Sequence, residues 1–183
     1  MWAKRFPVPE FDRYALKDLE WNAPGISGDS AGGDYGATAI AADSAICDKF
    51  NFQGEYLMIV ACSLPNQPVR ISGNSFAWPI QRAVMVDSLN ADECNVIADW
   101  KTPRPMNTRF GPDGGITVVA EKLYALIGHQ YADHWVGSRI MLDNEWLGNS
   151  DFGFRILSSS ETEINDFHDA VVYFEWDSSQ SES

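Results

Sequence analysis

Between Ala37 and Trp176 the chain alternates short apolar runs with clusters of glycine, proline, asparagine and aspartate. Runs of roughly four to nine residues bounded by such turn formers are typical of β-strands. They predict strands at 37–42, 55–63, 69–72, 82–87, 94–100, 115–124, 138–143, 153–157 and 170–176. Helical periodicity is scarce, although 14–21 and 122–130 could each form a helical turn instead.

This pattern predicts an all-β fold, an antiparallel two-sheet β-sandwich of jelly-roll or lectin-like type. The strands at 55–63 and 170–176 are apolar at nearly every position, so we expect both in the interior of their sheets. We divide the chain into an irregular N-terminal extension at 1–36 that packs on the core, the sandwich at 37–176, and a polar tail at 177–183.

The composition of the chain limits the classes of partner that it can bind. Its 26 acidic and 13 basic residues give a formal charge of −13, which argues against binding to nucleic acid and against electrostatic attachment to anionic membranes. Hydrophobic residues make up 45% of the sequence, enough for a folded core. No apolar run approaches the length of a transmembrane helix.

Three widely spaced cysteines, Cys47, Cys62 and Cys94, fit neither a disulfide framework nor a paired metal motif. They favour a reducing compartment. The first ten residues lack the apolar core of a secretory leader, so we expect a cytoplasmic protein or one exported without a classical leader.

No catalytic constellation emerges from the spacing of reactive residues. Ser30 lies in a glycine-rich loop at 28–33, but no histidine precedes it, unlike in trypsin-type enzymes. His129 and His134 are too far apart for a helical metal pair. We therefore expect a non-enzyme. A glycosidase remains an alternative because its two carboxylates can lie far apart in sequence.

An acidic loop precedes the last apolar strand and is the strongest functional signal. Hard cations such as Ca²⁺ prefer several oxygen ligands from a flexible loop. The predicted calcium ligands are Asp166, Asp169, Glu161, Glu163 and Asn165. The alternative is that these residues cap a turn and keep an edge strand soluble.

The run Asn165-Asp166-Phe167-His168-Asp169-Ala170-Val171-Val172, ending at Trp176, resembles the C-terminal loop and strand of the small bacterial calcium-dependent lectins that bind fucose and mannose. The resemblance extends loosely through 136–144 and 152–157. It implies that Asp166 and Asp169 are calcium ligands. Ile164 and His168 replace two further family ligands, so weak calcium binding or none is expected.

Tryptophans near polar residues are candidates for sugar contacts, because sugar rings stack on aromatic faces. Trp135 follows Asp133 and His134, and Trp146 follows Asn144 and Glu145. The predicted sugar-binding residues are Glu161, Asp166, Trp135, Trp146 and Asn144. For any single tryptophan the alternative is that it closes an end of the sandwich.

We therefore expect a non-catalytic, carbohydrate-binding lectin-like module, for which calcium dependence and a defensive or toxin-like role are further candidate properties. Its expected partners are fucose- or mannose-like glycans, and a homo-oligomer is expected because weak sugar sites gain from avidity. The alternative is a structural, assembly or pore-forming β-sandwich subunit that binds protein or membrane partners without recognising sugars.

Overall fold

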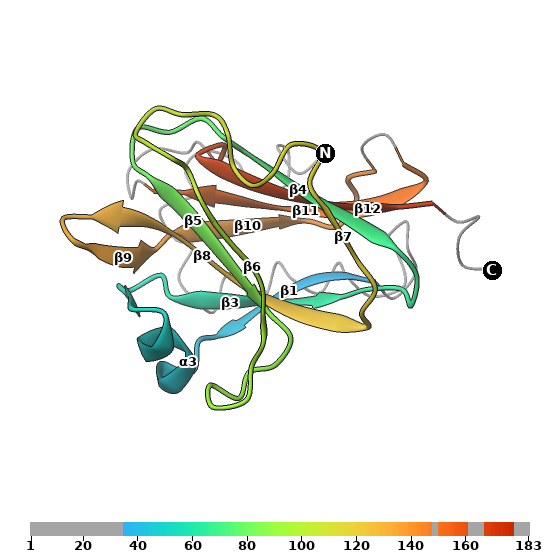
Figure 1. Cartoon of the computed structure of the whole chain (residues 1–183), viewed down its shortest axis with the longest axis horizontal. Helices are drawn as coiled ribbons and strands as arrows, with labels where there is room; N and C mark the ends of the chain where they lie inside the picture. Colours follow the sequence, from blue (N-terminus) through green and yellow to red (C-terminus); the bar gives the residue numbers. More distant parts are fainter. Residues whose placement is uncertain (1–34, 148–149, 161–166, 178–183) are drawn as a thin grey trace.

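The protein is described here by a computed structural model, which covers residues 35–147, 150–160 and 167–177. Two sheets face each other across one core (Figure 1). The first sheet has the order β1 (Gly36–Ala41), β3 (Met58–Ser63), β8 (Lys122–Tyr131), β5 (Gln81–Val86) and β6 (Val96–Lys101). The second has the order β10 (Arg139–Asp143), β11 (Phe152–Ser159), β12 (Ala170–Trp176), β4 (Val69–Ser75) and β7 (Ile116–Val118).

Two short strands extend the first sheet at one end. β9 (His134–Gly137) forms a hairpin with β8, and β2 (Phe52–Gln53) pairs with β9. The β2–β9 pairing is parallel, whereas every other pairing between the described strands is antiparallel. This end of the sheet is where the candidate site lies.

The space between the sheets is filled by apolar side chains from both inner faces. In the second sheet Phe154 stacks on Phe174 at 4.5 Å between ring centroids, and Trp176 meets Phe154 edge-on. Such aromatic pairs add stabilisation beyond the area that they bury. The outward face of this sheet is more polar, as expected where one face meets water.

The outer face of the first sheet is also covered. A second apolar cluster joins Ile59, Val84 and Leu126 to Ile46 and Phe50. Ile46 belongs to the single described helix, α3 (Ser44–Lys49), which Asp43 caps by accepting hydrogen bonds from the backbone N–H groups that follow it. The central strands of this sheet are therefore buried on both faces, and all six residues of β5 are buried.

The structure confirms the predicted two-sheet, nearly all-β fold. The strand predicted at 170–176 matches β12, and both β3 and β12 lie between two neighbouring strands, as expected. The predicted strand at 55–63 is shorter, because β3 begins at Met58. The predicted extension and polar tail lie mostly outside the described residues.

Three details of the sequence prediction were wrong. The single strand expected at 115–124 is two strands, β7 and β8, which belong to different sheets. The helical turn considered at 122–130 is strand throughout, because β8 pairs with β3 and β5 along both of its edges. Helix α3 and the strands β2 and β9 were not predicted.

All three cysteines are free thiols in the structure, in agreement with the absence of a disulfide framework. Burial raises the pKa of the Cys47 thiol to about 11, which makes this side chain unreactive at neutral pH. None of the described helices is long and apolar enough to cross a membrane.

We predict that Gly115→Ala destabilises the fold more than Gly114→Ala. Both glycines have φ of 77°, so alanine at either should cost about 1–2 kcal/mol from the left-handed backbone. A Cβ at Gly115 would lie 2.2 Å from the carbonyl oxygen of Ile71 in β4, whereas a Cβ at Gly114 meets nothing within 4 Å. The clash should add ~1–3 kcal/mol for Gly115→Ala.

Urea unfolding of the two variants measures this difference, with Gly114→Ala as the matched control for the backbone contribution. Equal losses of unfolding free energy would contradict the close approach of β7 to β4.

Candidate functional site

A pocket of about 370 Å³ opens where the first sheet passes into the second. We call it the Tyr56 pocket. Loop, β8 and β9 residues form one side, and β10, β11 and the residue after it form the other. The lining residues are Gly54, Glu55, Tyr56, His129, Val136, Gly137, Arg139, Ser159 and Ser160.

The pocket exists because the chain changes sheets within one residue. β9 ends at Gly137 in the first sheet, and β10 begins at Arg139 in the second. Ser138 between them is buried, and its N–H donates to the Ile127 carbonyl at 3.1 Å. The two strands diverge from this point, and the hollow lies beside the divergence.

His129 is held in the wall of the pocket by the same corner. Its Nδ1 lies 2.8 Å from the hydroxyl of Ser138, which leaves Nε2 as the ring's other polar atom. Burial lowers the pKa of His129, and the negative charge of Asp169 opposes this effect. The imidazole is therefore neutral at pH 7, and a neutral ring has one nitrogen donor and one nitrogen acceptor.

The Ser138–His129 pair does not have the form of a catalytic dyad. A nucleophilic serine must face the substrate, but Ser138 is 1% exposed and does not line the pocket. The hydroxyl instead fixes the orientation of the imidazole ring.

Asp169 fastens the end of the acidic loop to the pocket. Its Oδ2 accepts hydrogen bonds from the backbone N–H and the hydroxyl of Ser160, at 2.7 and 2.6 Å. Its backbone N–H donates to the Ser158 carbonyl, and its carbonyl accepts from the hydroxyl of Ser75. Because Ser160 lines the pocket, Asp169 is bonded to the pocket wall.

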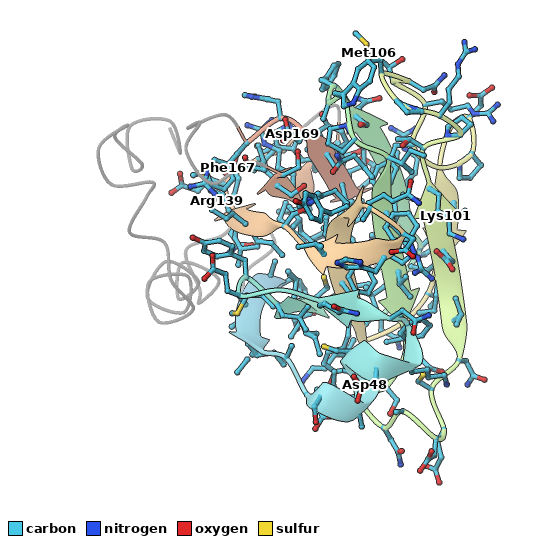
Figure 2. All side chains as sticks on the ribbon, turned by 90° about the vertical axis from the view of Figure 1, so that its left-hand side faces the viewer. Asp48, Lys101, Met106, Arg139, Phe167 and Asp169 are labelled. Carbon is cyan, nitrogen blue, oxygen red and sulfur yellow. The ribbon has the colours of Figure 1, made fainter. Side chains whose placement is uncertain are left out.

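Arg139 brings a buried cation to the same wall. Its guanidinium lies 5.3 Å from the centre of the Phe167 ring, a cation–π distance, and its side chain is among the largest that are fully buried. Figure 2 shows Arg139, Phe167 and Asp169 together on one side of the molecule. A buried guanidinium offers directed N–H donors to polar groups nearby.

Of the predicted calcium ligands, only Asp169 belongs to the described residues. Glu161, Glu163, Asn165 and Asp166 lie outside them, so their placement stays a prediction. In the part of the chain that the structure describes, no group of three histidine, cysteine, aspartate or glutamate side chains could hold a metal ion. The other side chains predicted to bind calcium with Asp169 therefore all belong to 161–166, outside the described residues.

Of the predicted sugar-binding residues, the structure describes Asn144, Trp135 and Trp146. Asn144 is buried, and its side-chain amide accepts from the N–H and donates to the carbonyl of Ala37, which ties β1 to the end of β10. Glu161 and Asp166 lie outside the described residues.

Both predicted tryptophans are partly buried and engaged with protein groups. The ring of Trp135 lies beneath the cations of Arg82, at 5.1 Å, and Lys101, at 6.0 Å. The ring of Trp146 packs on Tyr173 with 4.9 Å between centroids. Neither residue lines the Tyr56 pocket.

Two other open hollows, of about 340 and 390 Å³, flank the segment 109–113. Their aromatic residues, Trp100 and Phe110, are buried and cannot offer a ring face to a ligand. The Tyr56 pocket differs because the Tyr56 side chain is only partly buried at its rim.

Sequence reasoning missed the residues that line this pocket. Tyr56, Arg139, Ser159 and Ser160 lie in segments distant from one another in the sequence. One signal was available, because Arg139 is a charged residue inside an apolar run, and a buried charge usually has a structural or binding role.

No protein-family model matches this sequence, and no curated protein matches it. Solved structures with some likeness include a high-affinity mannose-binding lectin of Ralstonia solanacearum. It is 14% identical to this chain, has a TM-score of 0.47, and the match covers 63% of this chain and 94% of that chain. A Chromobacterium violaceum lectin in complex with α-methyl-fucoside has 13% identity, a TM-score of 0.43 and coverage of 63% and 94%.

The C-terminal domain of a Burkholderia cenocepacia lectin has 14% identity, a TM-score of 0.42 and coverage of 63% of this chain and 93% of that chain. Every TM-score is below 0.5, so the function of this chain does not follow from these neighbours.

We predict that the fold loses stability as the pH falls below the ordinary pKa of histidine, 6.5, because of His129. Its pKa is lowered in the folded protein, so the unfolded chain binds a proton that the folded protein does not. The stabilisation is present above pH 6.5 and is lost as the pH falls toward the folded pKa. Unfolding free energies of the wild type and His129→Gln, measured between pH 7 and 5, test this.

The variant should show a shallower fall than the wild type, and the exposed His168→Gln serves as the control. Parallel pH profiles for the wild type and His129→Gln would contradict a neutral, buried imidazole at the pocket.

Proposed function

We propose that the chain is a non-catalytic carbohydrate-binding module and that the Tyr56 pocket is its sugar site. The observation that carries the proposal is the convergence of a partly buried tyrosine ring with hydroxyl, imidazole and guanidinium groups in one pocket. Its volume is at the lower end of the range of ligand pockets, which suits a small polar ligand.

The chemistry of the lining matches the two faces of a sugar. A sugar ring has an apolar face of C–H groups, and the ring of Tyr56 can pack against it. Its hydroxyls both donate and accept, so they need partners of both kinds. Glu55 offers acceptor oxygens, His129 offers a ring nitrogen, and the Ser160 hydroxyl, which donates to Asp169, keeps lone pairs that can accept.

The described residues of the pocket show no reactive constellation, and this favours binding over catalysis. Ser138 is buried, and His129 is oriented by it instead of activating it. Among the described residues that line the pocket the one carboxylate is Glu55, whereas a glycosidase of the usual kind needs two. Binding without turnover is the function that these groups serve best.

Calcium enters the proposal through the acidic loop. The resemblance of 165–176 to the calcium loop of fucose- and mannose-binding lectins nominates Asp166 and Asp169, assisted by Glu161, Glu163 and Asn165. One oxygen of Asp169 is engaged with Ser160, and the other is available to a cation. Calcium bound by these residues would itself be able to bind sugar hydroxyls, because Ca²⁺ takes six to eight oxygen ligands.

We predict that Tyr56→Ala lowers sugar affinity by roughly tenfold, since an aromatic contact contributes up to about 1.5 kcal/mol. The assay is a glycan array followed by calorimetry with the best ligand. Tyr131→Ala is the matched control, because Tyr131 is 67% exposed and lies outside the pocket. An array without binding, or equal affinity for both variants, would refute the proposed site.

A separate prediction concerns calcium. Millimolar Ca²⁺ should raise the melting temperature of the wild type, because a ligand that binds only the folded state stabilises it. The double variant Asp166→Ala/Asp169→Ala should show no increase, while Asp92→Ala, which removes an exposed carboxylate elsewhere, should behave as the wild type. An unchanged wild-type melting temperature would mean that the acidic loop is structural and that any sugar binding is independent of calcium.

A further inference from the structure

Two loops at one end of the molecule are joined into a stiff double loop. They are the β4–β5 connection, 76–80, and the segment after β6, 102–109, which run together at the upper left of Figure 1. One hydrogen bond joins the two loops directly, from the Met106 N–H to the Trp78 carbonyl. Three more lie at their bases: the Ser75 N–H donates to the Thr108 carbonyl, the Thr102 N–H to the Gln81 carbonyl, and the Gln81 N–H to the Thr102 hydroxyl. The side chains on this double loop are therefore presented by an ordered backbone.

The double loop displays large apolar side chains to solvent. Phe76 is 61% exposed, Trp78 67% and Met106 69%. Met106 lies at the tip of the molecule in Figure 2. These three are among seven large hydrophobic residues that are exposed in the described part of the chain. An exposed apolar group concentrated on one rigid element marks an interaction surface.

The charge around these side chains differs from that of the whole chain. No acidic residue occurs between Asp99 and Asp113, whereas Lys101, Arg104 and Arg109 lie there and are exposed. The loop at 76–80 carries no charge. In a chain with 26 acidic and 13 basic residues, this segment is locally cationic.

The surface has acidic neighbours on its other sides. The Phe76 N–H donates to the carbonyl of Asp169, whose carboxylate accepts from Ser160. The β8–β9 hairpin is bonded to the loop at 76–80, because the Gln130 N–H donates to the Ile80 carbonyl. The turn of this hairpin contains the exposed Asp133. Asp99 and Asp113 line an open hollow together with Lys101 and Arg109, so the cationic segment has an acidic residue at each end.

We propose that the double loop is a docking surface for a phospholipid membrane that contains anionic lipids. Tryptophan and phenylalanine partition into the boundary between headgroups and acyl chains, and Met106 can enter the apolar layer. Arg104 and Arg109 match the lipid phosphates, which a planar guanidinium binds through two parallel N–H donors. This places the membrane contact on a different surface from the Tyr56 pocket.

The formal charge of −13 does not prevent this contact. At physiological ionic strength charges are screened beyond about 8 Å, so the acidic residues elsewhere repel the membrane weakly, while the arginines act at the lipid surface. The expected binding is peripheral, reversible and weakened by salt.

Sedimentation with phosphatidylcholine vesicles, with and without phosphatidylglycerol, tests the proposal on the full chain. The wild type should bind the mixed vesicles more tightly, and high salt should reduce this difference. Phe76→Ser/Trp78→Ser should lower partitioning roughly tenfold or more, since both side chains leave the apolar layer. Val119→Ser is the control, because Val119 is equally exposed at 61% but lies outside the double loop.

The charge contribution is tested separately. Arg104→Gln/Arg109→Gln should remove the preference for anionic lipid, while the exposed Lys122→Gln should retain it. Melting temperatures verify that each variant folds. Absence of vesicle binding, or partitioning unaffected by Phe76→Ser/Trp78→Ser, would overturn the proposal.

Two further results would assign the surface to other partners and overturn it as well. If Phe76→Ser/Trp78→Ser converts a dimer to a monomer in sedimentation velocity without affecting vesicles, the occupant is a second copy of this chain. If the same variant loses glycan binding but not vesicle binding, the surface is a sugar platform.

Discussion

Burial of the first sheet on both faces is the constraint on which the rest of the structure depends. All six residues of β5 are buried. Most residues of β3 and β8, the next two strands on one side of β5, are buried as well. Both faces of such strands must be covered. The second sheet covers one face, and α3 together with Phe52 covers the other. The chain passes between the two sheets several times, and its crossing from β9 to β10 forms the corner at Ser138 where the pocket lies.

The same sequence pattern explains how far the fold could be predicted. Apolar runs bounded by turn formers identified most strands, and β12 matches its predicted bounds. The pattern failed for short elements, because β2 has two residues and α3 six, too few for a period to appear. Asp43 was a usable sign of α3, since an aspartate before a small residue is a common N-cap. The strand β8 resembled a helix only because both of its faces are apolar.

The candidate site was less predictable than the fold. The acidic loop stood out because its residues are adjacent in sequence, whereas the pocket joins 54–56, 129, 136–139 and 159–160 through tertiary contacts. Asn144 attracted attention as a polar residue beside a tryptophan, yet both ends of its amide bind the backbone of Ala37. The spacing of residues in the sequence can identify a site formed by one loop. It does not show which strands distant in the sequence lie next to each other. Among the described residues, Asp169 is the predicted calcium ligand that bonds to a residue of the pocket lining, Ser160.

The central claim is that a sugar occupies the Tyr56 pocket. A titration of the isotopically labelled chain with fucose and mannose, followed by two-dimensional NMR of the backbone amides, tests it most directly because it locates binding without altering any residue. If a sugar binds in the pocket, the amide signals of 54–56, 129, 137–139 and 159–160 should show the largest chemical-shift changes, and these changes should saturate. Shifts confined to other surfaces, or none at saturating sugar, would contradict it.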